Sequence, residues 1–334
     1  MSQMAEKITK RAYARLGLMG NPGDAFGGAA LSLTIKNLWA EVTLEPSSRL
    51  IISEPEIEIP DWASLDDFQK HIRDRGYYGG RRLMIALLER LMAYGKKTHR
   101  PFECPNFTLS WKSIIPNRVG LAGSSALLTA ALRTLITHAH YEIPLLDQVD
   151  IIWKTEKENL GIPSGPQDRV AQVFEGLIFL RQTKEGELQV EELDYKTLPP
   201  LFVAINEITN EGTEIYHSNL RERYLEGDPV VQEGLRQLND LAIEARGLIN
   251  AHRGAELGPL IDRNFNIRQS LVRLNPSQEK MVLEARAAGA AAKFAGSGGA
   301  IVGTCPADKM EAVLSHLKSQ GYQTFLPQVR EPHR

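Results

Sequence analysis

A glycine- and serine-rich loop directly precedes a helical pattern at residues 119–128, which read VGLAGSSALL. From about Ser124 to His138 the apolar residues recur at helical spacing, so the loop is expected to end in a helix N-terminus. The first N–H groups of a helix lack intrahelical partners and carry partial positive charge, and glycines let an anion approach them. The loop therefore indicates either an anion site or a plain turn capped by Ser124 or Ser125.

Strand and helix patterns around this loop predict an α+β protein. Alternating apolar and polar residues over 12–59 indicate strands, and a helical pattern that follows them ends at Gly95. The composition changes near 194–200, and a chain of 334 residues exceeds the usual size of one core. We therefore expect two domains, residues 1–198 and 199–334.

The composition is that of an ordinary soluble protein from a reducing compartment. The formal net charge is −2 and the basic residues are scattered, which disfavours nucleic-acid binding. Cys104 and Cys305 are too few for a disulfide framework or a cysteine-rich zinc site. The N-terminus lacks a signal-peptide core, and no stretch approaches about 20 apolar residues. We expect a cytoplasmic protein without a membrane segment; monomer and homodimer both stay open.

A second loop, EKENLGIPSGPQDRV at 156–170, brings acidic residues to a Pro/Gly turn. Phosphoryl transfer needs one carboxylate near the acceptor hydroxyl and another on Mg²⁺. Glu156, Glu158 and Asp168 are the candidates, and Asp168 is the best of them because it lies in a turn between apolar runs. Taken singly, each of these acids is better explained as a solvated surface residue or a helix cap. No G-x-x-x-x-G-K-[ST] sequence is present, so a Walker-type phosphate loop is excluded.

Two further loops combine glycines with polar side chains. In RLGLMGNPGDAFGG, residues 15–28, Asn21 and Asp24 suit several sugar hydroxyls, or else an Asx-turn. In KFAGSGGAIVG, residues 293–303, the glycines permit close backbone approach beside the 119–125 loop or simply form a hairpin. Four such loops in one chain favour a functional interpretation over coincidence.

In chain order, RLGLMGNPGD, PNRVGLAGSSA and KFAGSGGAIVG resemble the three motifs of the GHMP small-molecule kinases. Within that superfamily the chain is most similar to the glucuronokinase group, as in FTLSWKSIIPNRVGLAGSSA and TEKENLGIPSGPQDRVAQVFEGLIFL. The similarity runs over roughly residues 12–305. It implies an N-terminal half like domain 2 of ribosomal protein S5, a ferredoxin-like C-terminal half, and an active site between them.

The resemblance also implies chemical roles by position. Asp168 would be the catalytic base, with Arg15 as the cation that steadies the transferring phosphoryl group. Mg²⁺ would be held by Ser125 and Glu156, although an alignment on Asp168 points nearer to Glu158. ATP would be bound by the two glycine loops, at Gly120, Leu121, Ala122, Gly123, Ser124, Ser125, Gly296, Ser297 and Gly298. The sugar would be held by Asn21, Asp24, Gly165 and Arg169.

The chain departs from the family pattern at the phosphate loop and on the sugar side. Arg118 occupies a position where the family has glycine, and Ala122 is an additional residue. Asn21 stands where galactokinase has an acid, which suits a negatively charged sugar, and Arg118 or Arg169 is a candidate partner for its carboxylate.

These features together predict an ATP- and Mg²⁺-dependent sugar 1-kinase that acts on D-glucuronate or a related sugar acid. The alternatives are another acceptor (galacturonate, a neutral hexose or a heptose phosphate) and a non-catalytic regulator that binds sugar and nucleotide.

Overall fold

The computed structural model describes most of the chain. The described residues are 6–53, 79–162, 164–183, 185–206 and 214–332, with the backbone alone for 214–218. Contacts divide the chain into two compact units. The first unit comprises Met1–Ala12, Trp39–Ile115 and Gly123–Ser164, and the second comprises Tyr13–Leu38, Pro116–Ala122 and Gly165–Arg334. The domain division at residue 198 stays a prediction.

Two long strands contribute residues to both units. They are β1 (Ile8–Met19) and β2 (Ala30–Pro46), which pair with each other. They confirm the strands expected within 12–59, of which residues 54–59 lie outside the described part of the chain. Burial alternates over only part of each strand, because residues 14–19 of β1 and 30–35 of β2 are all buried.

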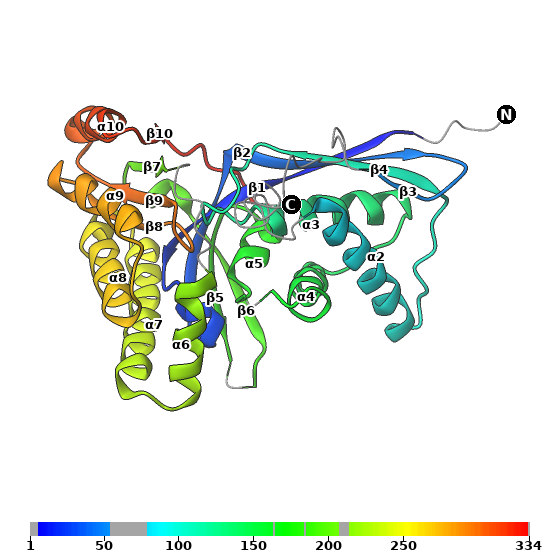
Figure 1. The fold of residues 1–334 in the computed structure, drawn as a ribbon, viewed down its shortest axis with the longest axis horizontal. Helices are drawn as coiled ribbons and strands as arrows, with labels where there is room; N and C mark the ends of the chain where they lie inside the picture. Colours follow the sequence, from blue (N-terminus) through cyan, green and yellow to red (C-terminus); the bar gives the residue numbers. More distant parts are fainter. Residues whose placement is uncertain (1–5, 54–78, 163, 184, 207–213, 333–334) are drawn as a thin grey trace, which may run out of the picture. The chain divides into compact units, whose positions relative to one another are not determined.

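The first unit packs helices on one side of a small group of strands. Its own elements are β3 (Ile51–Ile52), α2 (Gly80–Lys97), β4 (Phe107–Ser113), α3 (Gly123–His138), α4 (Leu145–Lys154) and a π-helical turn, η2 (Thr155–Asn159). β2 pairs antiparallel with β4, which pairs parallel with β3. Helices α2, α3 and α4 contact one another, and α3 contacts β4 (Figure 1). Helix α3 begins at Gly123, within the glycine–serine stretch and one residue before the predicted start at about Ser124.

Helix α2 does not end at Gly95, as the sequence suggests, but continues to Lys97. Gly95 is required for a different reason. The chain turns back after the helix, and a Cβ at Gly95 would lie 2.5 Å from the backbone nitrogen of Phe102. The backbone N–H of Arg100 donates to the Gly95 carbonyl at 2.9 Å. The glycine therefore permits a close backbone approach and is not a helix terminator.

The second unit contains the remaining elements. Its strands are β5 (Leu177–Gln182), β6 (Leu188–Leu193), β7 (Leu201–Ile205), β8 (Ala291–Phe294), β9 (Ala300–Thr304) and β10 (Gln323–Phe325). Its helices are α5 (Gln167–Phe174), α6 (Glu214–Leu225), α7 (Pro229–Asn250), α8 (Leu257–Leu271), α9 (Pro276–Ala287) and α10 (Met310–Ser319). Asp228 caps α7 by accepting from the Val230 and Val231 N–H groups, and Asn275 caps α9 in the same way.

Strands β10, β7, β9 and β8 form an antiparallel sheet in that order. Helices α8, α9 and α10 contact it (Figure 1), so strands and helix-containing connections follow the β–α–β–β–α–β order of a ferredoxin-like unit. Phe202, Phe265 and Phe294 lie in its core, with the rings of Phe265 and Phe294 edge to face at 5.4 Å. Burying each such ring contributes about 1.5–3 kcal/mol. The ferredoxin-like half expected from the resemblance is confirmed.

The C-terminal segment of the second unit lies along β2. The Arg330 N–H donates to the Thr34 carbonyl at 2.8 Å, and Val329 forms a bridge with Ile35. The Arg330 guanidinium donates to Glu175 at 2.8 Å. Glu175 directly follows α5, and its side chain is fully buried. The segment therefore supplies a cation to a carboxylate that water does not reach.

Replacement of this cation tests the segment's contribution to stability. We expect Arg330→Ala to lower the free energy of unfolding by about 1–3 kcal/mol, because the Glu175 carboxylate would stay buried with one partner fewer. Arg181→Ala, which removes an exposed arginine bonded to Gln189, should change it by less than about 0.5 kcal/mol. Urea unfolding of both variants measures the difference, and equal effects would contradict a structural role for the segment.

Candidate active site

The loop from Pro116 to Ala122 has an alternating backbone. Arg118, Gly120 and Ala122 have φ values of 59°, 74° and 63°, in the left-handed region, and the residues between them do not. Alternation of this kind turns successive N–H groups toward one concave side, a recurrent anion-binding geometry. The two departures from the family pattern, Arg118 and Ala122, thus adopt a conformation that glycine adopts more easily.

A second glycine loop packs against this one, backbone to backbone. A Cβ at Gly296 would lie 2.0 Å from the Gly120 carbonyl oxygen, and a Cβ at Gly299 would lie 2.8 Å from the Val119 Cα. Only glycine allows this approach. The loop between β8 and β9 is therefore both a hairpin and a neighbour of the 116–122 loop, so the two interpretations that the sequence left open both hold.

Two buried side chains that the sequence analysis did not single out hold these loops. Arg268 of α8 donates to the carbonyl oxygens of Gly296 at 2.5 Å and Ser297 at 2.8 Å. Gln172 of α5 donates to the Ala122 carbonyl at 2.8 Å. The Arg268 and Gln172 side chains hydrogen-bond to loop carbonyl oxygens, so they fix the orientation of the peptide groups in each loop.

Arg15 and Asp168, 153 positions apart in sequence, form an ion pair. Arg15 also donates to the carbonyl oxygens of Gly120 at 3.2 Å and Ala295 at 2.5 Å, so it touches both glycine loops. The Arg15 side chain is 5% exposed and that of Asp168 is 24% exposed. The carboxylate is therefore the accessible end of the pair, with the guanidinium fixed behind it.

Asp24, Gly165 and Arg169 lie beside this pair. Asp24 accepts from the Gln167 N–H at 3.3 Å, and a Cβ at Gly165 would lie 2.0 Å from its Oδ2. Arg169 donates to the Gly165 carbonyl at 2.9 Å and lies 3.7 Å from Asp168 Oδ2. Three of the four predicted sugar-binding residues thus lie beside the predicted base.

Burial raises the pKa of Asp24 to about 6. The Asp168 carboxylate adds to the rise, whereas the Gln167 N–H, Arg15 and Arg169 oppose it. An unfolded aspartate has a pKa of about 3.9. Between these values the folded protein binds more protons than the unfolded chain, so the Asp24 contribution to stability falls as pH rises from about 4 through 6.

Replacement of Asp24 by asparagine should remove this pH dependence. The wild-type protein should lose up to roughly 3 kcal/mol of unfolding free energy relative to Asp24→Asn between pH 4 and pH 7.5. Urea unfolding of both proteins at a series of pH values measures the difference. Parallel curves would show that Asp24 ionises normally in the fold.

Glu156 and Glu158 occupy different surroundings in the first unit. Glu156, in the π-helical turn, is fully buried and accepts from the Ser124 hydroxyl at 2.7 Å. The Glu158 side chain is 50% exposed and pairs with Arg90 at 2.9 Å. π-Helical turns within longer helices are frequent at functional sites. The turn brings Glu156 to the N-terminus of α3, where Ser125 is also buried.

A hydroxyl and a carboxylate are hard oxygen donors, the type that Mg²⁺ prefers. The hydroxyl that meets Glu156 in the structure is that of Ser124, next to the predicted Ser125. This donor set fits a magnesium ion that keeps most of its ligands as water and phosphate oxygens.

The structure thus assembles the predicted residues in two groups. The second unit brings together Arg15, Asn21, Asp24, Gly120, Leu121, Ala122, Gly165, Asp168, Arg169, Gly296, Ser297 and Gly298. The first unit brings Ser124 and Glu156 together at the start of α3, beside Gly123 and Ser125. One peptide bond joins Ala122 to Gly123, which sets their Cα atoms about 3.8 Å apart.

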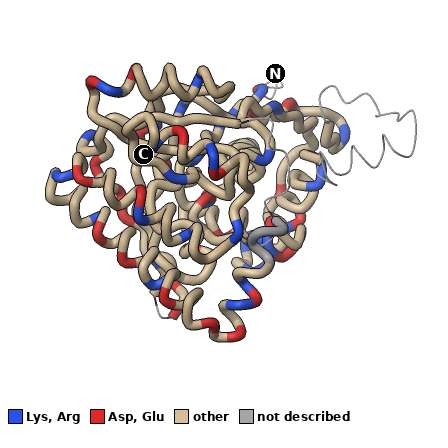
Figure 2. The backbone as a smooth tube through the Cα atoms, turned by 60° about the vertical axis from the view of Figure 1, so that its left-hand side comes forward, with Lys and Arg blue, Asp and Glu red and all other residues tan. Residues whose placement is uncertain are grey.

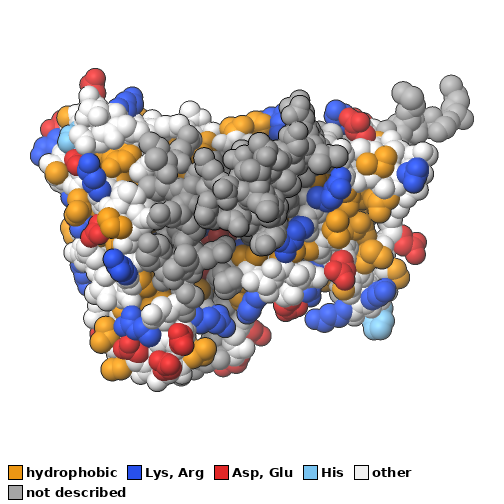
Figure 3. Space-filling view, in the orientation of Figure 1, with side chains coloured by type: hydrophobic (Ala, Val, Ile, Leu, Met, Phe, Trp, Pro, Cys, Tyr) orange, Lys and Arg blue, Asp and Glu red, His pale blue; other side chains and the backbone are white. Residues whose placement is uncertain are grey.

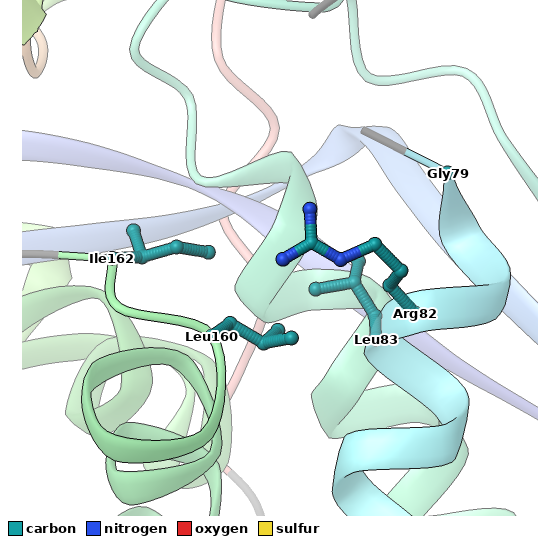
Figure 4. A pocket seen from close by; sticks show the side chains of 5 residues that line it. All are labelled: Gly79, Arg82, Leu83, Leu160 and Ile162. Carbon is teal, nitrogen blue, oxygen red and sulfur yellow. The ribbon is translucent and has the colours of Figure 1, made fainter. Parts of the chain in front are cut away.

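The first unit also has a small hollow between α2 and the segment that follows η2. Its lining residues are Gly79, Arg82, Leu83, Leu160 and Ile162. Figure 4 shows the Leu83 and Leu160 side chains pointing toward each other from α2 and from the segment after η2, with the Arg82 guanidinium above them. The lining combines an apolar floor with one cation and contains no carboxylate.

Basic and acidic residues are interspersed in the two views of the described chain. Figure 2 shows basic and acidic residues interspersed along the backbone, and on the face in Figure 3 side chains of both signs lie among apolar ones. Helix α7 gives an example, where Arg236 pairs with Glu233 and Asp240. In the described part of the chain, no helix has the length and apolar character needed to cross a membrane.

Comparison with known proteins places these motifs in context. Residues 83–176 match the family model of the GHMP kinases N-terminal domain. The chain is 37% identical over 315 residues to Glucuronokinase 1 of Arabidopsis thaliana, covering 91% of this chain and 86% of that protein. It is 38% identical over 308 residues to Probable glucuronokinase 2 of the same plant, covering 89% and 84%. The solved mevalonate kinase of Methanococcus jannaschii aligns with a TM-score of 0.74 at 15% identity, over 98% of this chain and all of that one.

Proposed function

Because the chain belongs to the glucuronokinase family of the GHMP kinases, we propose that it transfers the γ-phosphoryl group of ATP to the anomeric hydroxyl of D-glucuronate. The product is the sugar-acid 1-phosphate, with ADP as the second product. The Arg15–Asp168 ion pair, with its carboxylate on the accessible side, carries the proposal because it supplies a base for the hydroxyl and a cation beside it.

The two glycine loops bind the nucleotide phosphates in this proposal. The alternating backbone at 118–122 and the N-terminus of α3, which begins at Gly123, offer N–H groups to phosphate oxygens. Gly296 and Ser297, held by Arg268, keep the second loop against the first. Preorganised donors of this kind stabilise charge on the transferring group without reorganising during the reaction.

Asp168 accepts the proton of the anomeric hydroxyl as that oxygen forms its bond to the γ-phosphorus. The bond between the γ-phosphorus and the bridging oxygen breaks, and the electron pair leaves with ADP. Arg15 stays beside Asp168 and places positive charge near the phosphoryl oxygens. Ser124 or Ser125 together with Glu156 would hold Mg²⁺, which supplies charge neutralisation for the phosphates when bound.

The sugar-acid preference is supported by the charges around Asp168. Arg15 pairs with Asp168, and Arg169 lies 3.7 Å from the same carboxylate. Guanidinium groups beside the base can also pair with the carboxylate of a bound uronate. Asn21, which is neutral, adds no repulsion.

Steady-state ATP consumption tests the proposal directly. The purified protein with Mg²⁺ is assayed against glucuronate, galacturonate, galactose, mevalonate and homoserine, each over a range of concentrations. Glucuronate is expected to give the highest kcat/KM. A higher value with a neutral hexose would keep the kinase assignment and overturn the sugar-acid preference. ATP binding without turnover of any acceptor would favour the non-catalytic regulator.

A further inference from the structure

Lys293 is a buried lysine within strand β8, in the third glycine motif. Its side chain is 1% exposed, and Nζ lies 2.7 Å from the Gly17 carbonyl oxygen, 2.6 Å from Asn21 Oδ1 and 2.9 Å from the Phe294 carbonyl oxygen. Lysines are almost never fully buried without a partner of opposite charge. All three of these partners are uncharged, so Lys293 has an unusual environment that core packing does not explain.

The three contacts define the state of the Lys293 side chain. An ammonium has three N–H donors, and three oxygen acceptors lie at bonding distance from Nζ, so the geometry matches the ammonium form. Burial lowers the pKa of Lys293, and the nearby cations Arg268 and Arg15 lower it further. The three oxygen atoms oppose this lowering, because each can accept a hydrogen bond from the ammonium.

Lys293 also fixes the orientation of the Asn21 amide. A lysine can only donate, so the group facing Nζ must be the amide oxygen, and the amide nitrogen faces the other way. The backbone of the same loop is held separately: Asn264 accepts from the Gly20 N–H at 2.7 Å and donates to the Asn21 carbonyl at 3.2 Å. Among the hydrogen bonds between described residues, the Asn21 side chain takes part through Oδ1 and not through Nδ2.

We propose that Lys293 is a positioning residue for the sugar acid, which holds Asn21 Oδ1 so that the amide N–H₂ group is turned toward an acceptor oxygen of the substrate. The buried cation behind the amide polarises its N–H groups and makes them better donors to an anionic or hydroxyl oxygen. The inference rests on the proposed function only in that Asn21 touches the sugar.

A double-mutant cycle tests whether Lys293 acts through Asn21. Lys293→Met, Asn21→Ala and the double variant are assayed for the KM of the sugar and the KM of ATP. Each single variant should raise the sugar KM by at least about tenfold and leave the ATP KM within about twofold. If Lys293 acts through Asn21, the double variant should show the same sugar KM as Asn21→Ala. Multiplicative effects, or an equal rise in the ATP KM, would overturn the inference.

Asn21→Asp covers the case in which Lys293→Met fails to fold. It keeps an oxygen on the Lys293 ammonium and adds a counter-charge, but it replaces the N–H₂ donor with an acceptor. Its sugar KM should rise at least about tenfold, and a wild-type sugar KM would contradict the proposal. Lys309→Met, which removes an exposed lysine of the same unit, should leave both KM values unchanged.

The same assay separates this inference from the proposed function. The wild-type acceptor panel decides the substrate, and the ratio of variant to wild-type sugar KM decides the role of Lys293 for whichever acceptor is turned over. A different preferred acceptor would therefore overturn the proposed substrate and leave the Lys293 proposal standing. An unchanged sugar KM in the variants would overturn the Lys293 proposal and leave the proposed substrate standing.

Discussion

Replacement of Asp168 by asparagine should lower kcat by roughly 10²–10⁴-fold while the KM of ATP stays within about threefold of wild type. Asparagine has nearly the shape of aspartate and can still accept a hydrogen bond from Arg15, so the local structure should persist. It cannot take the proton of the sugar hydroxyl. The loss therefore falls on the chemical step, and single-turnover kinetics at saturating ATP and sugar measures it.

Asp308→Asn is the matched control for this prediction. Asp308 is an exposed aspartate of the same unit, so the same chemical change there should leave turnover at the wild-type level. A nearly normal kcat for Asp168→Asn would show that another group accepts the proton or that none is needed.

Replacement of Glu156 by glutamine should raise the Mg²⁺ concentration for half-maximal activity by at least roughly tenfold. Glu156 is fully buried and meets the Ser124 hydroxyl, and glutamine can keep that hydrogen bond while it loses the negative charge. The affinity for a divalent cation depends on that charge. A Mg²⁺ titration at fixed ATP and sugar concentrations measures the shift.

Glu158→Gln is the control that decides between the two alignments. Glu158 is half exposed and pairs with Arg90, so its replacement should leave the Mg²⁺ dependence unchanged. The opposite pattern, in which Glu158→Gln shifts the titration and Glu156→Gln does not, would make Glu158 the metal-binding residue.

Local sequence patterns predict helix α3 and the β8–β9 hairpin of Figure 1 well. Helix α3 starts at Gly123, because the glycine and serines of this stretch favour a helix N-terminus and the apolar residues that follow have helical spacing. The β8–β9 hairpin follows from glycines between two short apolar runs. Gly95 was interpreted wrongly, because a glycine that permits a close backbone approach has the same local sequence as one that ends a helix.

The residues of the candidate site likewise fall into those that sequence motifs predict and those that only the structure identifies. The sequence contained Asp168, Arg15 and the glycine loops as recognisable motifs, whereas Lys293, Arg268, Asn264 and Gln172 gave weaker signals. A lysine inside the apolar run AAKFAG was the one signal that could have singled out Lys293. The roles of these residues depend on partners far away in the chain, up to 276 positions in the case of Gly17 and Lys293.

By itself, the sequence determined which loops carry glycines and polar groups, where the main helices begin, and the family to which the chain belongs. Those properties depend on neighbours a few residues apart. Only the tertiary structure decided that Asp168 is the accessible end of an ion pair, and that Glu156 is buried while Glu158 is half exposed. Burial and long-range pairing are set by how strands and helices pack, and a local pattern of side chains does not contain that information.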